Sequence, residues 1–222
     1  MVRFLMMALL LCVGSCTRLD CDLWNSSGFF GEATAADVRR CLAAGSDVNA
    51  QAQDGWTPLL VAAGFGAAET VAALIEAGAD MEVRTGEGWT PLHVAAGFGD
   101  AGVIATLIEA GADMEAQDRS DWTPLHMAAE YGTAATVAAL IKAGADPMAG
   151  DRDGRFPVDL AEDNPRVKDH DIFRILEETR AAFIEAEAMI IAWDKDDATP
   201  LHRAAREGNA VMVAALIKAG AD

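Results

Sequence analysis

The sequence predicts an all-α solenoid of about six stacked helix-turn-helix-loop units, and two observations carry this prediction. First, a short motif recurs every 33 residues: Asp-Gly-Trp-Thr-Pro-Leu at 54–59, Glu-Gly-Trp-Thr-Pro-Leu at 87–92 and Ser-Asp-Trp-Thr-Pro-Leu at 120–125. Degenerate copies follow at 153–158 and 196–201. Second, apolar residues at helical spacing follow the motif. A fixed period of this length indicates stacked small units rather than one closed core.

Within one unit the local signals place two helices. Thr57 is a helix N-cap candidate, and Pro58 suits the first helical position because the N–H it lacks would be unpaired there. We expect Gly66 to end this first helix in the left-handed conformation. A second helix with Val71 and Leu74 on one face follows, and a polar loop then leads to the next copy of the motif.

The first fifteen residues are predicted to be a signal peptide. A short basic start precedes ten uncharged residues, 4–13, a run too short to span a bilayer, which needs about 20. The segment Val-Gly-Ser-Cys at 13–16 resembles the lipobox of bacterial lipoproteins, which implies lipid modification at Cys16 and a tether over residues 16–21. The alternative is plain cleavage after Ser15, which would leave Cys16 as a free thiol.

The cysteines fit export. Cys12 leaves with the signal and Cys16 takes the lipid, so Cys21 and Cys41 remain and are predicted to form a disulfide. The alternative is a buried Cys41 thiol with Cys21 unrelated to it. Because no Cys-x-x-Cys or Cys/His ligand spacing is present, we expect neither a metal site nor a cofactor.

After the leader, the chain divides into a degenerate N-terminal capping unit, three regular units, an irregular unit and an incomplete one. Their predicted bounds are 22–53, 54–86, 87–119, 120–152, 153–195 and 196–222. In the irregular unit the helical pattern runs on over 179–194, as one long helix or a kinked pair. Its apolar stripe of Ile184, Ala188 and Ile191 is expected to meet the following unit or, alternatively, a partner. The last unit stops in mid-repeat, which suits a natural terminus or a truncated chain, and its apolar residues are expected to face a missing neighbour. These are Val211, Val213, Leu216 and Ile217.

The chain resembles the ankyrin repeat family over residues 22–222. The family motif Asp-Gly-x-Thr-Pro-Leu-His-x-Ala-Ala stands at 87–96 as Glu-Gly-Trp-Thr-Pro-Leu-His-Val-Ala-Ala, and Gly-Ala-Asp recurs at 78–80, 111–113, 144–146 and 220–222. The resemblance implies a non-catalytic protein-binding module. It also implies that the motif histidines, His93, His126 and His202, are structural.

Positions that the ankyrin family leaves variable line its hairpin tips and concave face. Here they hold aromatic residues at the 33-residue step, predicted to form two parallel rows that bind a partner. The rows are Trp56, Trp89 and Trp122, and Phe65, Phe98 and Tyr131. Tryptophan and tyrosine are enriched at binding hot spots. The alternative is that each tryptophan only covers its own loop.

The net charge of the chain limits the classes of partner that it is expected to bind. With 17 basic and 35 acidic residues the chain carries a net charge of −18, which repels nucleic acid and anionic membrane surfaces and favours a basic protein. The acidic residues alternatively serve solubility alone. We therefore predict an interaction scaffold of the bacterial envelope, either a lipoprotein on the periplasmic face or a periplasmic or secreted protein, with membrane contact only through Cys16. Other possibilities are a targeting module for an enzyme or toxin domain beyond residue 222, a stabiliser of an envelope enzyme, or a cytoplasmic protein with a misread leader.

Overall fold

The computed structural model describes residues 20–52, 55–191 and 199–221, and this part of the chain contains helices and no strand. A short 3-10 helix, η1 (Cys21–Leu23), precedes twelve α-helices. These are α2 (Ser27–Phe30), α3 (Ala35–Ala43), α4 (Pro58–Phe65), α5 (Ala68–Glu76), α6 (Pro91–Phe98), α7 (Ala101–Glu109), α8 (Pro124–Tyr131), α9 (Ala134–Ala143), α10 (Pro157–Ala161), α11 (Asp171–Ile191), α12 (Pro200–Arg206) and α13 (Ala210–Lys218).

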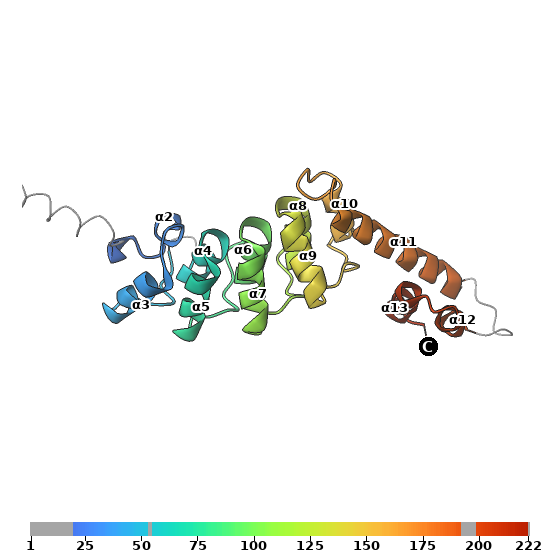
Figure 1. Cartoon of the computed structure of the whole chain (residues 1–222), viewed down its shortest axis with the longest axis horizontal. Coiled ribbons are helices and arrows are strands. Elements are labelled where there is room, and N and C mark those ends of the chain that lie inside the picture. The colour runs from blue at the N-terminus through green and yellow to red at the C-terminus, as the bar shows by residue number, and fades with distance from the viewer. Residues whose placement is uncertain (1–19, 53–54, 192–198, 222) are drawn as a thin grey trace, which may run out of the picture.

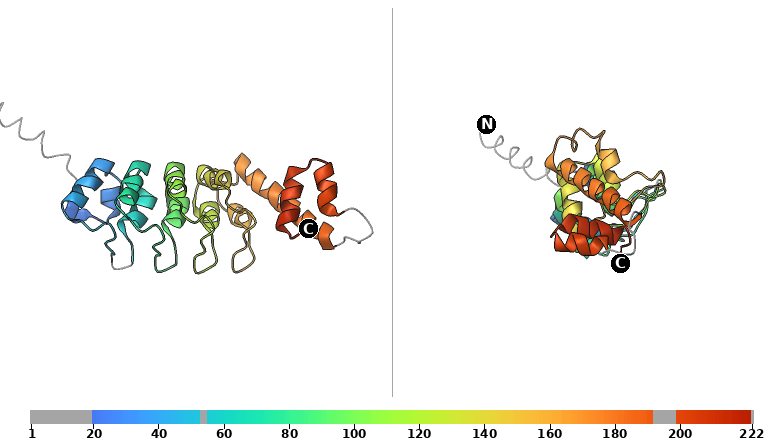
Figure 2. Two further views of the ribbon diagram at one scale, coloured as in Figure 1. Left: turned by 90° about the horizontal axis from the view of Figure 1, so that it is seen from below. Right: turned by 90° about the vertical axis from the view of Figure 1, so that its right-hand side faces the viewer.

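The helices form two layers along one axis. Helices α2, α4, α6, α8 and α10 pack in succession as an inner row, and α3, α5, α7 and α9 form an outer row beside them (Figure 1). The loops that join consecutive units all project to the same side of the stack (Figure 2). This arrangement confirms the predicted helical repeat solenoid.

The repeated motif starts helices α4, α6 and α8 as predicted, each with a threonine N-cap followed by proline. The Thr57 hydroxyl accepts a hydrogen bond from the Leu60 N–H at 3.4 Å, and Pro58 occupies the first turn of α4. Leu59, Ala62 and Ala63 are completely buried between neighbouring units. Small alanine side chains let the inner helices approach closely, so the buried stripe continues from unit to unit.

Gly66 does not adopt the left-handed conformation that we predicted for it. Its φ is −94° and its ψ 172°, an extended conformation open to any residue. The requirement for glycine is instead steric, because a Cβ at this position would lie 2.8 Å from the carbonyl oxygen of Ala62. The left-handed turn comes at the end of the second helix, where Gly78 has φ +90°.

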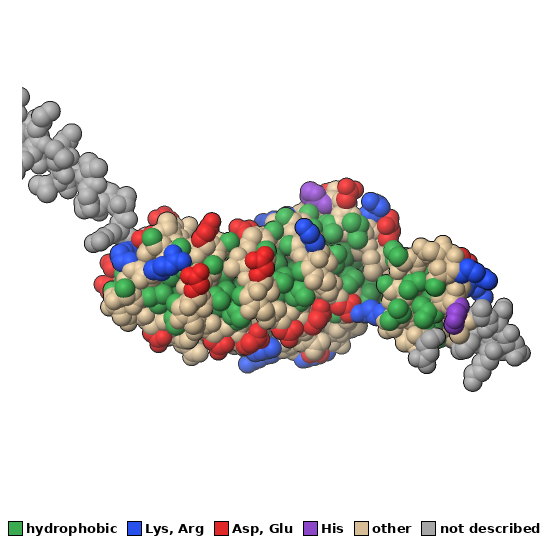
Figure 3. Space-filling view, turned by 60° about the horizontal axis from the view of Figure 1, so that its bottom comes forward, with side chains coloured by type: hydrophobic (Ala, Val, Ile, Leu, Met, Phe, Trp, Pro, Cys, Tyr) green, Lys and Arg blue, Asp and Glu red, His purple; other side chains and the backbone are tan. Residues whose placement is uncertain are grey.

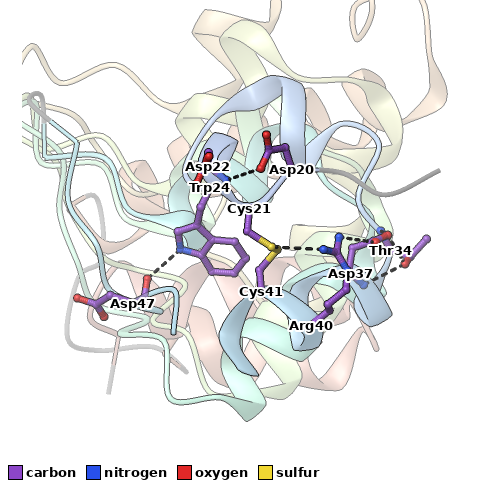
Figure 4. Close-up of a disulfide and its surroundings, with 9 residues drawn as sticks. All are labelled: Asp20, Cys21, Asp22, Trp24, Thr34, Asp37, Arg40, Cys41 and Asp47. Atoms are coloured by element: carbon purple, nitrogen blue, oxygen red, sulfur yellow. Dashed lines mark hydrogen bonds and ion pairs between the residues drawn. A yellow bond between two sulfur atoms is a disulfide. The ribbon is translucent and has the colours of Figure 1, made fainter. Parts of the chain in front are cut away.

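A disulfide closes the first unit (Figure 4). Cys21 and Cys41 are joined with their Cα atoms 5.4 Å apart, which confirms the predicted pair. Close by, Trp24 packs against Phe29 with ring centroids 5.4 Å apart, and its indole N–H donates to the Asp47 carbonyl at 2.9 Å. An aromatic cluster and a covalent link therefore close this end of the stack, where no further unit of the described part covers the core.

The irregular unit contains one long helix rather than a kinked pair. Helix α11 runs without interruption over 21 residues and leaves the stack at an angle (Figure 1). The predicted stripe does not pack on the following unit: Ile184 is 54% exposed and Ala188 is also exposed, whereas Ala186 is completely buried with Phe183 beside it. The buried face is the one that α13 covers, while the Ile191 side chain lies outside the described part.

The terminal repeat, α12 and α13, packs on the far half of α11 and has its own small core. Leu216 is completely buried there, so the prediction that it faces a missing neighbour was wrong; Val211 and Ile217 are exposed, at 54% and 60%. An ion pair between Lys218 and Asp146 links α13 back to the fourth unit. The last repeat is thus attached to the stack mainly through one helix.

The predicted signal peptide and the proposed lipid site at Cys16 lie outside the described residues. Among the helices of the described part, none is long and apolar enough to cross a bilayer.

Candidate functional site: the aromatic hairpin face

Two hairpin loops are each braced by an aspartate that reaches across to the tryptophan of the preceding hairpin. One carboxylate oxygen of Asp118 accepts the N–H groups of Ser120 and Trp122, at 2.7 and 2.9 Å, and so closes its own loop. Its other oxygen accepts the indole N–H of Trp89, 29 residues earlier, at 3.1 Å. A single side chain thereby fixes the loop and joins it to the neighbouring tryptophan.

Asp151 repeats this arrangement one unit later. It accepts the Trp122 indole N–H at 3.1 Å and the Arg155 backbone N–H at 2.8 Å. The Asp151 side chain is 1% exposed. Burial by itself raises its pKa, but hydrogen bonds from the backbone and guanidinium of Arg155 outweigh this effect and hold the pKa below its ordinary value.

Two of the three motif histidines, His93 and His126, are buried and link neighbouring units by hydrogen bonds, as the ankyrin resemblance implies. His93 Nδ1 accepts the Thr90 N–H at 3.2 Å, so Nε2 carries the proton and donates to the carbonyl of Trp122 at 2.9 Å. His126 bridges Thr123 and the Arg155 carbonyl in the same way, at 3.1 and 3.2 Å. Burial lowers the pKa of both imidazoles, so they are neutral at pH 7. His202, by contrast, is exposed.

The six predicted partner-binding aromatics differ in exposure between the two rows. Phe65, Phe98 and Tyr131 stand at the ends of α4, α6 and α8 and are 54%, 49% and 45% exposed. Trp56, Trp89 and Trp122 are half-buried in the loops. The tryptophans therefore combine a structural role with a partly open ring, whereas Phe65, Phe98 and Tyr131 face solvent.

The two rows meet over the second and third of the three regular units, 87–152. Phe98 stacks on Tyr131 with centroids 6.0 Å apart and planes inclined by 18°. Trp89 lies 6.2 Å from Phe98, and Trp122 lies 6.2 Å from Tyr131. We call the six residues together the aromatic face.

Two hollows open between successive hairpins on this face. Trp56, Thr85, Gly86, Glu87 and Trp89 line one of about 360 Å³. The next, of about 150 Å³, lies between Trp89 and Trp122, with Glu87, Asp118, Ser120, Met127 and Tyr131 completing its wall. Both combine aromatic walls with carboxylates, so they suit apolar and cationic groups better than anionic ones.

Two features of the site were not predicted from the sequence: the aspartates that brace the hairpins, and the cation at the fourth position of the tryptophan register, Arg155. Asp118 and Asp151 stand 33 residues apart, and Thr85 occupies the same register one unit earlier, so the period itself contained the signal. Arg155 stands in the tryptophan register, and its guanidinium lies over the Trp122 ring at 6.0 Å from the centroid. Across the described ranges, no three His, Cys, Asp or Glu side chains gather in a way that would hold a metal ion.

Comparison with known families agrees with this architecture. A model of ankyrin repeats in three copies matches residues 32–118, and one of ankyrin repeats in many copies matches 107–161. A single-repeat model matches 196–222. The chain is built of ankyrin repeats. Such repeats are typically non-catalytic and generally act as protein–protein interaction modules. No curated protein gives a significant match to the chain.

Proposed function

We propose that this ankyrin-repeat chain is a scaffold that captures a protein partner on its aromatic face. The observation that carries the proposal is the row of Phe65, Phe98 and Tyr131, which keeps about half of each ring open to solvent over three consecutive units. Soluble proteins seldom keep contiguous apolar patches exposed unless the patch is used. These rings stand at the ends of helices, and the braced tryptophans Trp89 and Trp122 pack beside two of them. The surface is therefore ordered before binding, which reduces the entropy lost on association.

The chemistry of the surroundings favours a basic partner. Glu87 and Asp118 line the hollows beside the rings, and acidic side chains gather along one edge of the stack (Figure 3). With a net charge of −18, the chain attracts cations over several ångströms and repels phosphate-rich polymers. We expect association to slow as salt is added, because screening weakens this attraction.

We further propose that the chain is exported and anchored by a lipid at Cys16 in a bacterial envelope. The lipobox-like segment 13–16 and the Cys21–Cys41 disulfide support the proposal, since disulfides persist mainly in oxidising compartments. Mass spectrometry of the mature N-terminus tests it. A diacylated or triacylated Cys16 agrees with the proposal, whereas an unprocessed Met1 contradicts it, and a free N-terminal Cys16 supports export without the anchor.

Partner capture tests the proposed function. The full chain is immobilised and exposed to envelope extract, and retained proteins are compared between the wild type and a variant carrying Phe98→Ser and Tyr131→Ser. These rings are half exposed, so the variant should fold normally yet lose the partner. The matched control carries Val211→Ser and Ile217→Ser, two exposed apolar residues on α13. Equal retention by all three proteins would reject the aromatic face as the binding surface.

A further inference from the structure

The hairpin interface between Trp56 and Trp89 differs from its two successors. At the next two interfaces an aspartate accepts the indole N–H of the preceding tryptophan, Asp118 from Trp89 and Asp151 from Trp122. Thr85 stands in the aspartate register at the first interface, and its hydroxyl accepts the Trp89 backbone N–H at 3.2 Å. Among the described residues, nothing accepts the indole N–H of Trp56.

With threonine instead of aspartate at position 85, more space is left between the two hairpins. The hollow between Trp56 and Trp89 measures about 360 Å³, against about 150 Å³ for the equivalent hollow between Trp89 and Trp122. Its walls are two indole rings, and Glu87 lies at its edge with an exposed side chain that pairs with no cation of the described residues. The nearby Arg84 is bound elsewhere, because its guanidinium donates to the Gln117 carbonyl at 2.7 Å.

The chain itself contains a filled version of such a site. At the third interface Arg155 occupies the tryptophan register, and its guanidinium lies over the Trp122 ring, 6.0 Å from the centroid. The same guanidinium pairs with the Asp151 carboxylate at 2.8 Å. A guanidinium held between an indole face and a carboxylate is therefore compatible with this hairpin geometry. The flat, delocalised guanidinium stacks on the face of an indole ring better than an ammonium group does.

We propose that the hollow between Trp56 and Trp89 binds a guanidinium group, the side chain of an arginine in the partner, with the indole rings as walls and Glu87 as counter-ion. The volume, the aromatic walls, the Glu87 carboxylate, which no described cation pairs with, and the Arg155 arrangement all fit this occupant. The proposal rests on the function proposed above and makes it more specific. It assigns the partner an arginine that enters the aromatic face at its N-terminal end.

The test uses a defined probe, so it does not depend on finding the partner. The acetylated and amidated tripeptide Gly-Arg-Gly is titrated into the ¹⁵N-labelled full chain, and the indole N–H signals are followed by NMR. The signals of Trp56 and Trp89 should shift saturably, while that of Trp24, in the first unit, stays in place. Gly-Lys-Gly should bind at least about twofold more weakly, because an ammonium is more strongly hydrated.

Three variants locate the site. Glu87→Gln should weaken Gly-Arg-Gly binding about two- to fivefold, the size expected for one exposed cation contact. Glu82→Gln removes an equal charge from an exposed residue of the same loop that does not line the hollow, and should leave binding unchanged. Trp56→Leu should abolish the shift of the Trp89 signal. Equal weakening by both glutamate variants, or no saturable shift, would overturn the proposal.

The outcomes separate this proposal from the broader one. If partner capture depends on Phe98 and Tyr131 but is unchanged by Glu87→Gln and Trp56→Leu, the aromatic face binds the partner and the guanidinium site is wrong. If capture is indifferent to Phe98 and Tyr131 while the tripeptide still shifts the two indole signals, the hollow binds guanidinium and the proposed function fails.

Discussion

The buried histidines His93 and His126 should make the stability of the stack depend on pH near neutrality. Burial lowers the pKa of His93 and His126 below the ordinary value of 6.5, so the folded chain resists a proton that the unfolded chain accepts. The stabilisation is therefore complete above the unfolded pKa and is lost as pH falls below it toward the folded pKa. Each group loses at most about 1.4 kcal/mol per pH unit in that window, so the pair loses up to about 2.7 kcal/mol by about pH 5.5.

Urea unfolding followed by circular dichroism at about pH 7.5 and pH 5.5 measures this loss. The control variant carries His93→Gln and His126→Gln, because glutamine at this third helical position can still reach back to the threonine N–H. The exposed His170 and His202 are common to both proteins and cancel in the comparison. The wild type should lose up to about 2.7 kcal/mol more than the variant on acidification. An identical pH dependence in the two proteins would show that burial of these two histidines does not make stability depend on pH.

Three further predictions concern particular contacts. Trp122→Phe should lower the free energy of unfolding by about 1 kcal/mol, because the indole hydrogen bond to buried Asp151 is lost. Combined with Asp151→Asn, it should lower that free energy by less than the sum of the two single changes. Urea unfolding measures both effects. Cys21→Ser should destabilise the first unit by about 3 kcal/mol on the chain-entropy model for a loop of this length, seen as faster amide exchange in α3 while α8 is unchanged. Phe183→Ala should release the terminal repeat alone, so that amides of α13 exchange faster and those of α6 do not.

Much of the fold could be predicted because the repeated motif specifies its own local structure. Threonine and proline start helices α4, α6 and α8, and buried Leu and Ala residues pack each of these units on the next, so one period predicts the next. The prediction failed where contacts with residues outside the local motif determine the conformation or burial of a residue. Gly66 is required by a nearby carbonyl rather than by its φ. The buried face of α11 is selected by α13, which the local pattern of Ile184 and Ala188 could not reveal.

The candidate site was predictable in its residues but not in its organisation. The 33-residue step identifies the tryptophans and Phe98 as neighbours, because recurrence in a solenoid means proximity. It does not show that the indole N–H of Trp89 is already bound by Asp118, which leaves Phe98 and its equivalents as the more open rings. It also did not reveal that Thr85 in the aspartate register enlarges one hollow, since that depends on the reach of a side chain across two loops.

Site-specific photo-crosslinking tests the central claim, that the aromatic face is the partner-binding surface, most directly. A photo-reactive phenylalanine analogue replaces Phe98 in the full chain, and in a second protein it replaces Glu109, an exposed residue at the end of the outer helix α7. After irradiation in the native cells, crosslinked products are identified by mass spectrometry. We predict one discrete partner adduct from position 98 and none from position 109. The same adduct from both positions, or an adduct from position 109 alone, would contradict it.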